Sequence, residues 1–305
     1  MRILCERARR APACARALLS AACALHGFNP AAGLACLVTG GTGGIGAELV
    51  AELASRGHLV AFTARSAESA RGLEARVCRA VGPGRAVHWP LDLRRCRAGD
   101  FERLLDDVEH MLAQPVALVV NNAAVCEPGH DARAYARALR VNAAAPAALG
   151  AAALARMRRR GFGRVVNVSS GDGERVYLHS SVLELLDRSQ TLAELSRGVL
   201  VMLCNFDTRI EYAHGPTPAY SWSKALLNRA TQLGAMEIGE GEDVLLNAAC
   251  PGDVLTAMMT PGVDPTEARS PAEAAASLLM AAFLDEAATS KRNGLFLRDG
   301  SPIAF

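Results

Sequence analysis

The 305-residue sequence has few aromatic residues and almost no excess of charge of either sign. Phe, Trp and Tyr make up 5% of the chain, and 33 basic against 31 acidic residues leave a formal charge of +2. Nucleic-acid binding requires a concentrated basic face, which this balance does not provide. No apolar run approaches the roughly 18 residues that a membrane span needs. We therefore expect neither nucleic acid nor a membrane as a partner.

Paired cysteines and metal-ligand spacings are also missing. The nine cysteines are scattered and form no Cys-x-x-Cys pair, and the seven histidines show no His-Glu-x-x-His spacing. This favours reduced thiols in a reducing compartment over a disulfide framework or a zinc site. We expect a soluble protein without a bound metal, located in the cytoplasm.

The first 26 residues allow a different location. They carry five arginines against the single acid Glu6, a composition typical of a mitochondrial transit peptide. The apolar stretch 17–24 resembles a short signal peptide, and an extension without any address fits the same residues. We treat residues 1–32 as an N-terminal extension and keep a mitochondrial location as the alternative.

Half of the residues are apolar, enough to bury a large core, and from Leu34 onward short apolar β-type runs alternate with helical stretches. The predicted strands span residues 34–39, 58–63, 86–89, 116–120, 164–168, 244–249 and 294–297. The predicted helices span residues 45–56, 66–81, 100–113, 135–160, 220–238 and 271–284. This alternation implies one α/β domain over residues 33–305, with a single doubly wound, Rossmann-type, mainly parallel sheet and helices on both faces.

A glycine-rich loop joins the first predicted strand to the first helix. Thr39-Gly-Gly-Thr-Gly-Gly-Ile-Gly46 lets the backbone approach a pyrophosphate at a helix N-terminus. An NAD site would place an acid at the end of the next strand, but the residues there are Thr63-Ala64-Arg65. A guanidinium can pair with a 2′-phosphate, so Arg65 predicts NADP(H) as the cofactor.

A tyrosine and a lysine begin the helix predicted at residues 220–238. The four-residue spacing puts Tyr220 and Lys224 on one helix face. A free phenol with a pKa near 10 is a poor proton donor at neutral pH, and a nearby ammonium would lower that pKa toward the working range.

Further motifs occur in the order typical of the short-chain dehydrogenase/reductases, which the chain resembles over about residues 34–300. They are Thr39-Gly-x-x-x-Gly-x-Gly46, Asn121-Asn-Ala-Ala124, Val166-Asn-Val-Ser-Ser170, Tyr220-x-x-x-Lys224 and Cys250-Pro-Gly252. The resemblance implies that Ser170 binds the substrate carbonyl, that Tyr220 donates the proton to the substrate, and that Lys224 lowers the pKa of Tyr220. It also implies that Asn142 positions a water that passes protons to Lys224. The cofactor residues that it implies, together with Arg65, are Gly40, Thr42, Gly44, Ile45, Gly46, Asp92, Asn122, Tyr220, Lys224, Pro251, Gly252, Val254 and Thr256.

Forty-nine residues separate Ser170 from Tyr220, where many family members have about a dozen. Apolar residues from Leu192 to Phe206 recur at helical spacing, and Leu183 and Leu186 suggest a shorter helix before them. We therefore predict a helical insertion at about 171–218, which resembles that of the monomeric carbonyl reductases. In that subgroup the insertion covers the surface through which relatives form oligomers, so the resemblance implies a monomer.

The sequence also departs from that subgroup in places. Gly43 stands where the subgroup has a basic residue that helps to bind the 2′-phosphate. Arg65 would therefore bind that phosphate with less help. Asp253 replaces a tryptophan of the substrate pocket and would favour a polar or cationic substrate. Cys250 matches a thiol near the cofactor pocket.

Taken together, these residues predict an enzyme that reduces an aldehyde, ketone or quinone with NADPH, with Tyr220 as the proton donor. One alternative is an NAD(P)-linked alcohol or steroid dehydrogenase. The other is a cofactor-binding sensor without catalysis, which should have lost part of the set Asn142, Ser170, Tyr220 and Lys224; all four residues are present.

Overall fold

The computed structural model describes residues 33–126, 129–207, 212–258, 264–284 and 293–305, so the predictions for the extension at 1–32 lie outside the described residues. Its strands are β1 Ala35–Val38, β2 Leu59–Ala64, β3 Ala86–Pro90, β4 Val116–Asn121, β5 Phe162–Val168, β6 Asp243–Ala249, β7 Phe296–Arg298 and β8 Ser301–Pro302. Its helices are α3 Gly44–Ser55, α4 Ala67–Val81, α5 Ala98–Leu112, α6 Ala132–Leu139, α7 Ala145–Arg160, α8 Ser180–Arg188, α9 Leu192–Cys204, α10 Pro218–Ala235 and α11 Pro271–Ala282.

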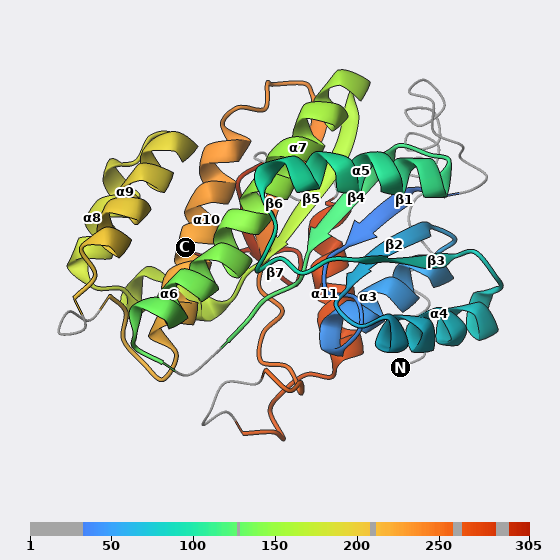
Figure 1. The fold of residues 1–305 in the computed structure, drawn as a ribbon, viewed down its shortest axis with the longest axis horizontal. Coiled ribbons are helices and arrows are strands. Elements are labelled where there is room, and N and C mark those ends of the chain that lie inside the picture. The colour runs from blue at the N-terminus through green and yellow to red at the C-terminus, as the bar shows by residue number, and fades with distance from the viewer. Residues whose placement is uncertain (1–32, 127–128, 208–211, 259–263, 285–292) are drawn as a thin grey trace.

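The described strands form one sheet in the order β3-β2-β1-β4-β5-β6-β7-β8 (Figure 1). Neighbouring strands from β3 to β7 are parallel, and β8 pairs antiparallel with β7. This confirms the predicted doubly wound, mainly parallel α/β fold. The strand order reverses direction between β1 and β4, which is where such sheets bind ligands.

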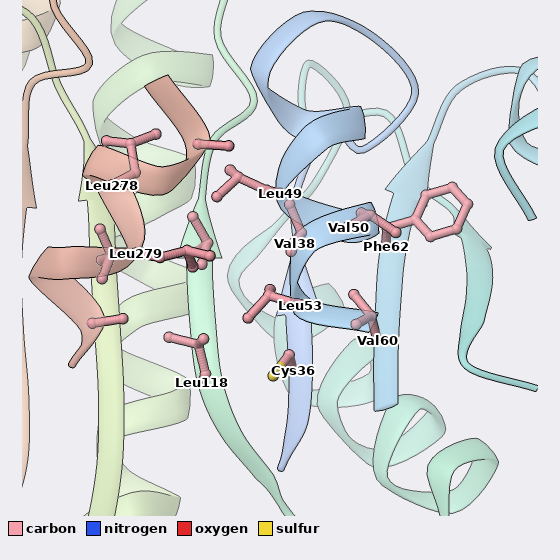
Figure 2. Close-up of a cluster of buried hydrophobic side chains, with 14 of the residues drawn as sticks. Cys36, Val38, Leu49, Val50, Leu53, Val60, Phe62, Leu118, Leu278 and Leu279 are labelled. Carbon is pink, nitrogen blue, oxygen red and sulfur yellow. The ribbon is translucent and has the colours of Figure 1, made fainter. Parts of the chain in front are cut away.

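Helices cover both faces of the sheet, which explains the almost continuous apolar composition of its central strands. Every residue of β1 and β4 is buried. On one face α3, α4 and α11 pack on the sheet, and Figure 2 shows Leu49 and Leu53 of α3 against Val38 and Leu118. On the other face α5 and α7 pack on the same strands.

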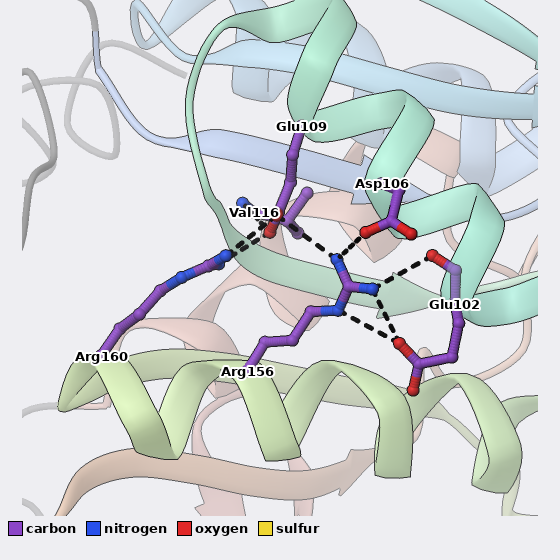
Figure 3. A network of polar contacts seen from close by, with 6 residues as sticks. All are labelled: Glu102, Asp106, Glu109, Val116, Arg156 and Arg160. Atoms are coloured by element: carbon purple, nitrogen blue, oxygen red, sulfur yellow. Dashed lines mark hydrogen bonds and ion pairs between the residues drawn. The ribbon is translucent and has the colours of Figure 1, made fainter.

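An ionic network joins α5 to α7 over the second face (Figure 3). Arg156 contacts the carboxylates of three α5 residues, at 2.7, 2.8 and 3.4 Å: Glu102, Asp106 and Glu109. Arg160 pairs with both oxygens of Glu109 at 2.7 and 2.9 Å, and Glu109 also accepts the Val116 amide N–H at 3.0 Å. Glu109 therefore connects two helices to the start of β4.

The long helix predicted at 135–160 is interrupted, and this is a correction. A π-helical turn at Arg140–Ala144 separates α6 from α7. Its cause is tertiary, since the buried Asn142 in this turn bonds to the loop after β4. The combined helical run Ala132–Arg160 is long and apolar enough to cross a membrane by length and composition alone. However, 61% of its apolar stretch is buried inside the fold. Such burial is typical of a core helix.

The insertion forms α8 and α9, as its periodicity predicts. Val182, Leu185 and Leu186 of α8 and Leu195 of α9 are buried in a cluster with α10. The two helices lie beside α10 at the edge of the molecule (Figure 1). The predicted apolar face of the insertion therefore packs on the helix that carries Tyr220.

Candidate active site

The parallel strands of the sheet end at one edge, and there the predicted site residues gather. A groove of about 420 Å³ follows this edge. Twelve of the predicted cofactor residues line it: Gly40, Thr42, Gly44, Ile45, Gly46, Arg65, Asp92, Asn122, Tyr220, Lys224, Pro251 and Thr256. The loops after separate strands thus build one continuous binding surface.

The glycine loop can adopt its shape only without side chains. Gly40 has φ +66° and Gly44 has φ +49°, both in the left-handed region that favours glycine. A Cβ on Gly40 would lie 2.9 Å from the Ala123 Cβ, and one on Gly46 would overlap the Gly40 carbonyl oxygen. The loop therefore brings backbone, rather than side chains, to the surface of the groove.

The start of α3 fits a pyrophosphate. Gly43, the N-cap residue of α3, has no side chain that could cap the helix, and the first turn of the helix contains no acidic residue. The first backbone N–H groups of a helix lack intrahelical partners and carry partial positive charge. An uncapped helix N-terminus beside a glycine cradle is the donor set that a dinucleotide phosphate requires.

Two threonines brace this loop, and sequence reasoning missed both. Thr39 Oγ1 accepts the backbone N–H groups of Asn122 and Ala123, both at 3.0 Å, and Thr63 Oγ1 accepts that of Gly40 at 3.0 Å. The Asn122 side-chain amide donates to the carbonyl oxygens of Thr39 and Gly40 at 3.0 and 3.1 Å. Asn122, predicted to bind the cofactor, uses its amide to hold the loop. The signal for the threonines was their position at the ends of β1 and β2.

The far end of the groove carries charged side chains. Arg65 is exposed there, and it has no ion-pair partner among the residues that the structure describes. Asp92 pairs with Arg94, whose Nη2 lies 2.7 Å from its Oδ2. Hydrogen bonds from Arg94 hold the pKa of Asp92 below its ordinary value. Sequence reasoning did not single out Arg94.

The proton-transfer residues lie at the other end. Lys224 is 2% exposed, its Nζ donates to the Val168 carbonyl oxygen at 2.6 Å, and it lies 5.4 Å from the centre of the Tyr220 ring. The Tyr220 hydroxyl makes a hydrogen bond with Ser170. The structure thus brings Ser170, Tyr220 and Lys224 together, as predicted.

The pKa values of this pair differ from the expectation. Burial, followed by the negative charge of Asp172, raises the pKa of Tyr220, and only the hydrogen bond with Ser170 opposes that shift. Burial also lowers the pKa of Lys224 to about 8. The protein's own groups therefore keep Tyr220 protonated; the predicted lowering of this pKa relied also on the positive charge of an oxidised nicotinamide. Asp172, two residues beyond Ser170, is a further functional candidate that the sequence reading missed.

Asn142 joins two distant segments through its side-chain amide. Its Oδ1 accepts the Val125 backbone N–H at 2.8 Å, and its Nδ2 donates to the Val125 carbonyl at 2.8 Å and to Ser223 Oγ at 3.0 Å. Both amide protons are thus used inside the protein. The side chain connects the loop after β4 to α10, next to Lys224.

Three predicted residues of the loop after β6 do not line the groove. Gly252 turns the chain with φ +76°, Val254 is buried and bridges to Arg269, and the Asp253 carbonyl accepts the Arg269 N–H at 2.8 Å. This pairing leaves the Asp253 side chain exposed and outside the groove. The predicted substrate contact of Asp253 is therefore not supported by its position.

Six cysteines lie in the described part of the chain, and all are free thiols. Cys250 is buried, and Arg298 Nη2 lies 3.2 Å from its sulfur. Among the described residues, no group of three or more His, Cys, Asp or Glu side chains could hold a metal ion.

The doubly wound sheet, the glycine loop and the Tyr–Lys pair define a dinucleotide-dependent oxidoreductase. A family model described as short chain dehydrogenase matches residues 35–184. The chain belongs to the short-chain dehydrogenase family, whose members are oxidoreductases that bind NAD(P)(H).

Solved structures with the same fold are numerous. Salutaridine reductase from Papaver somniferum has a TM-score of 0.71 and 21% identity, covering 86% of this chain and 99% of its own. Menthone neomenthol reductase from Mentha piperita has a TM-score of 0.71 and 20% identity, covering 88% and 99%. A doubly substituted mutant of a Serratia marcescens short-chain dehydrogenase/reductase has a TM-score of 0.64 and 22% identity, covering 89% and 99%. No curated protein sequence matches the chain.

Proposed function

We propose that this protein reduces a small-molecule aldehyde, ketone or quinone to the alcohol with NADPH. The observation that carries the proposal is the placement of Tyr220 and Lys224, with Ser170 bonded to Tyr220, in a groove that Arg65 also lines. Two of the structures with this fold are named reductases, which supports the direction of the reaction.

The protein's groups suit the donation of a proton to the substrate. A dihydronicotinamide held in the groove would supply the hydride for the carbonyl carbon. The Ser170 hydroxyl donates a hydrogen bond to the carbonyl oxygen as that oxygen gains negative charge. Tyr220 then transfers its hydroxyl proton to this oxygen, which completes the alcohol.

Burial and Asp172 raise the pKa of Tyr220, so the phenol holds its proton until the substrate oxygen accepts it. Lys224, with a pKa lowered to about 8, can exchange a proton near neutral pH and return one toward Tyr220. At neutral pH Tyr220 therefore carries the proton that reduction of a carbonyl requires.

The end of the groove that holds Arg65 and Asp92 is the end that we assign to the adenosine of the cofactor. Its residues support NADP(H) over NAD(H). β2 ends in Ala64 and is followed by the exposed Arg65, with no acid that could hold a 2′-hydroxyl. We expect Arg65→Asp to raise the Michaelis constant for NADPH at least tenfold, on the order of one lost charged contact. An unchanged constant would remove the support for NADP(H).

The test of the activity is NADPH oxidation followed at 340 nm against a panel of quinones, aldehydes and ketones. Tyr220→Phe should abolish turnover while leaving NADPH binding intact, because the ring remains and only the acidic hydroxyl is lost. Retained turnover in Tyr220→Phe would refute the mechanism.

We further propose a monomer, because α8 and α9 pack their buried residues on α10 of the same chain. Light scattering should give a mass near 32.1 kDa, and twice that value or more would count against it. We also propose a cytoplasmic location, with mitochondrial import through residues 1–26 as the alternative. Fluorescent fusions with and without these residues distinguish the two.

A further inference from the structure

Asp92 and Arg94 form a two-pronged ion pair in the turn between β3 and α5. Arg94 Nε lies 2.9 and 3.1 Å from the two carboxylate oxygens of Asp92, and Nη2 lies 2.7 Å from Oδ2. The backbone N–H of Arg94 also donates to Oδ1 at 3.1 Å. Both side chains line the adenosine end of the groove. The geometry fixes the guanidinium against the carboxylate.

The balance of charge at this end depends on Arg94. Three ionised side chains line it, Arg65, Asp92 and Arg94, and together they leave one net positive charge. Without Arg94 the carboxylate of Asp92 would cancel the charge of Arg65. The neighbouring Arg95 is exposed and does not line the groove.

A carboxylate is unfavourable beside a phosphate that carries about two negative charges. The Asp92 side chain is 25% exposed, so water screens its charge only in part. The glycine loop adds no compensating cation, because Gly43 occupies the position between Thr42 and Gly44. The cation that offsets Asp92 most strongly is therefore Arg94, which bonds to it directly, whereas Arg95 acts on it only through its charge.

We propose that Arg94 is a second determinant of preference for the 2′-phosphorylated cofactor, acting by cancelling the charge of Asp92 at the adenosine end of the groove. This inference rests on the proposed NADP(H) specificity. In this proposal Arg65 attracts the 2′-phosphate, and Arg94 neutralises the carboxylate of Asp92 that would repel it.

The test compares two probes by titration calorimetry, adenosine 2′,5′-bisphosphate and 5′-AMP. The ratio of their affinities isolates the 2′-phosphate, because the rest of the two molecules is the same. We expect Arg94→Ala to lower this ratio roughly two- to fivefold, the range for one charge at a partly exposed site. Arg94→Gln, which keeps hydrogen-bond donors without the charge, should lower it by a similar factor. Arg95→Ala, the matched control, removes a charge that acts on Asp92 without a hydrogen bond and should lower the ratio by less than Arg94→Ala.

A double variant tests how Arg94 acts. If its role is to cancel Asp92, then Asp92→Asn in the Arg94→Ala background should return the ratio to near the wild-type value. A ratio that stays low in the double variant would overturn the inference. The inference would also be overturned if Arg94→Ala gave the same affinity ratio as Arg95→Ala while Arg65→Ala still lowered the ratio. In that case the assignment of NADP(H) as the cofactor would stand. A wild-type ratio near one would instead refute the NADP(H) preference itself, and this inference with it.

Discussion

Lys224 should destabilise the protein at neutral pH, because it holds a charge inside the fold. It is 2% exposed, and burial lowers its pKa from 10.5 to about 8. At about 1.4 kcal/mol for each pH unit, this shift corresponds to about 3 kcal/mol against the charged form. Lys224→Met removes that cost and also the hydrogen bond to the Val168 carbonyl, which contributes about 1 kcal/mol. The variant should therefore be more stable by about 2 kcal/mol at pH 7.

The advantage should disappear as the pH rises, and its sign follows from linkage. Between the folded-state pKa of about 8 and the unfolded value of 10.5, the unfolded chain binds a proton that the folded chain has released. Wild-type stability therefore rises relative to the variant across that window. Approaching pH 10.5, the neutral lysine keeps its hydrogen bond, and the wild type should become the more stable protein by about 1 kcal/mol.

Urea unfolding of both proteins from pH 7 to pH 10.5 measures this difference, and titrations common to both cancel. Arg71→Met, which removes an exposed cation from α4, is the control and should change stability by less than about 0.5 kcal/mol at every pH. A difference between Lys224→Met and the wild type that stays constant across the series would refute a buried, depressed lysine.

Three further predictions follow from contacts described above. Asn142→Ala leaves both backbone groups of Val125 without their side-chain partner and should cost about 2 kcal/mol in urea unfolding, with weaker NADPH binding by fluorescence titration. Gly46→Ala drives a Cβ into the Gly40 carbonyl and should weaken NADPH binding more than about tenfold, whereas Gly72→Ala, with open space around it, should not; equal affinities would contradict the cradle. For Glu109, burial would raise the pKa, but the bonds from Arg160 and Val116 hold it below 4.5. Above pH 4.5 the wild type should thus be more stable than Glu109→Gln by about 1 kcal/mol. It should lose that advantage as acid protonates the folded carboxylate. Urea unfolding of both proteins from pH 3 to 7 measures the difference.

The parts of the fold that the sequence predicted are those governed by local pattern. Apolar runs bounded by glycine gave the strands, and the periodicity from Leu192 to Phe206 gave the helix α9. The glycine loop and the Tyr220–Lys224 spacing were visible because each is contiguous or within one helical turn.

The features that the sequence did not predict depend on contacts between distant segments. Residues 140–144 have ordinary helix-forming composition, and the π-helical turn arises because Asn142 must reach Val125. Asp253 follows the expected Pro-Gly pair, but its backbone pairs with Arg269, and this pairing leaves its side chain outside the groove. The raised pKa of Tyr220 depends first on burial and then on Asp172, which only the folded loop after β5 brings near the phenol.

One buried amide joins the two halves of the site. Asn142 binds both backbone groups of Val125, which continues the loop that Thr39 fixes to the glycine loop. The same amide donates to Ser223 Oγ, and this hydroxyl donates in turn to the Tyr220 carbonyl at 2.7 Å. The start of α10 is therefore held against the cofactor loop by a chain of hydrogen bonds rather than by sheet pairing. In the proposed reduction, hydride and proton must reach adjacent atoms of one carbonyl group, so this chain would set the position of the Tyr220 hydroxyl against the groove. Asn142 thus acts through position, and its loss should reduce turnover even where Tyr220, Ser170 and Lys224 all remain.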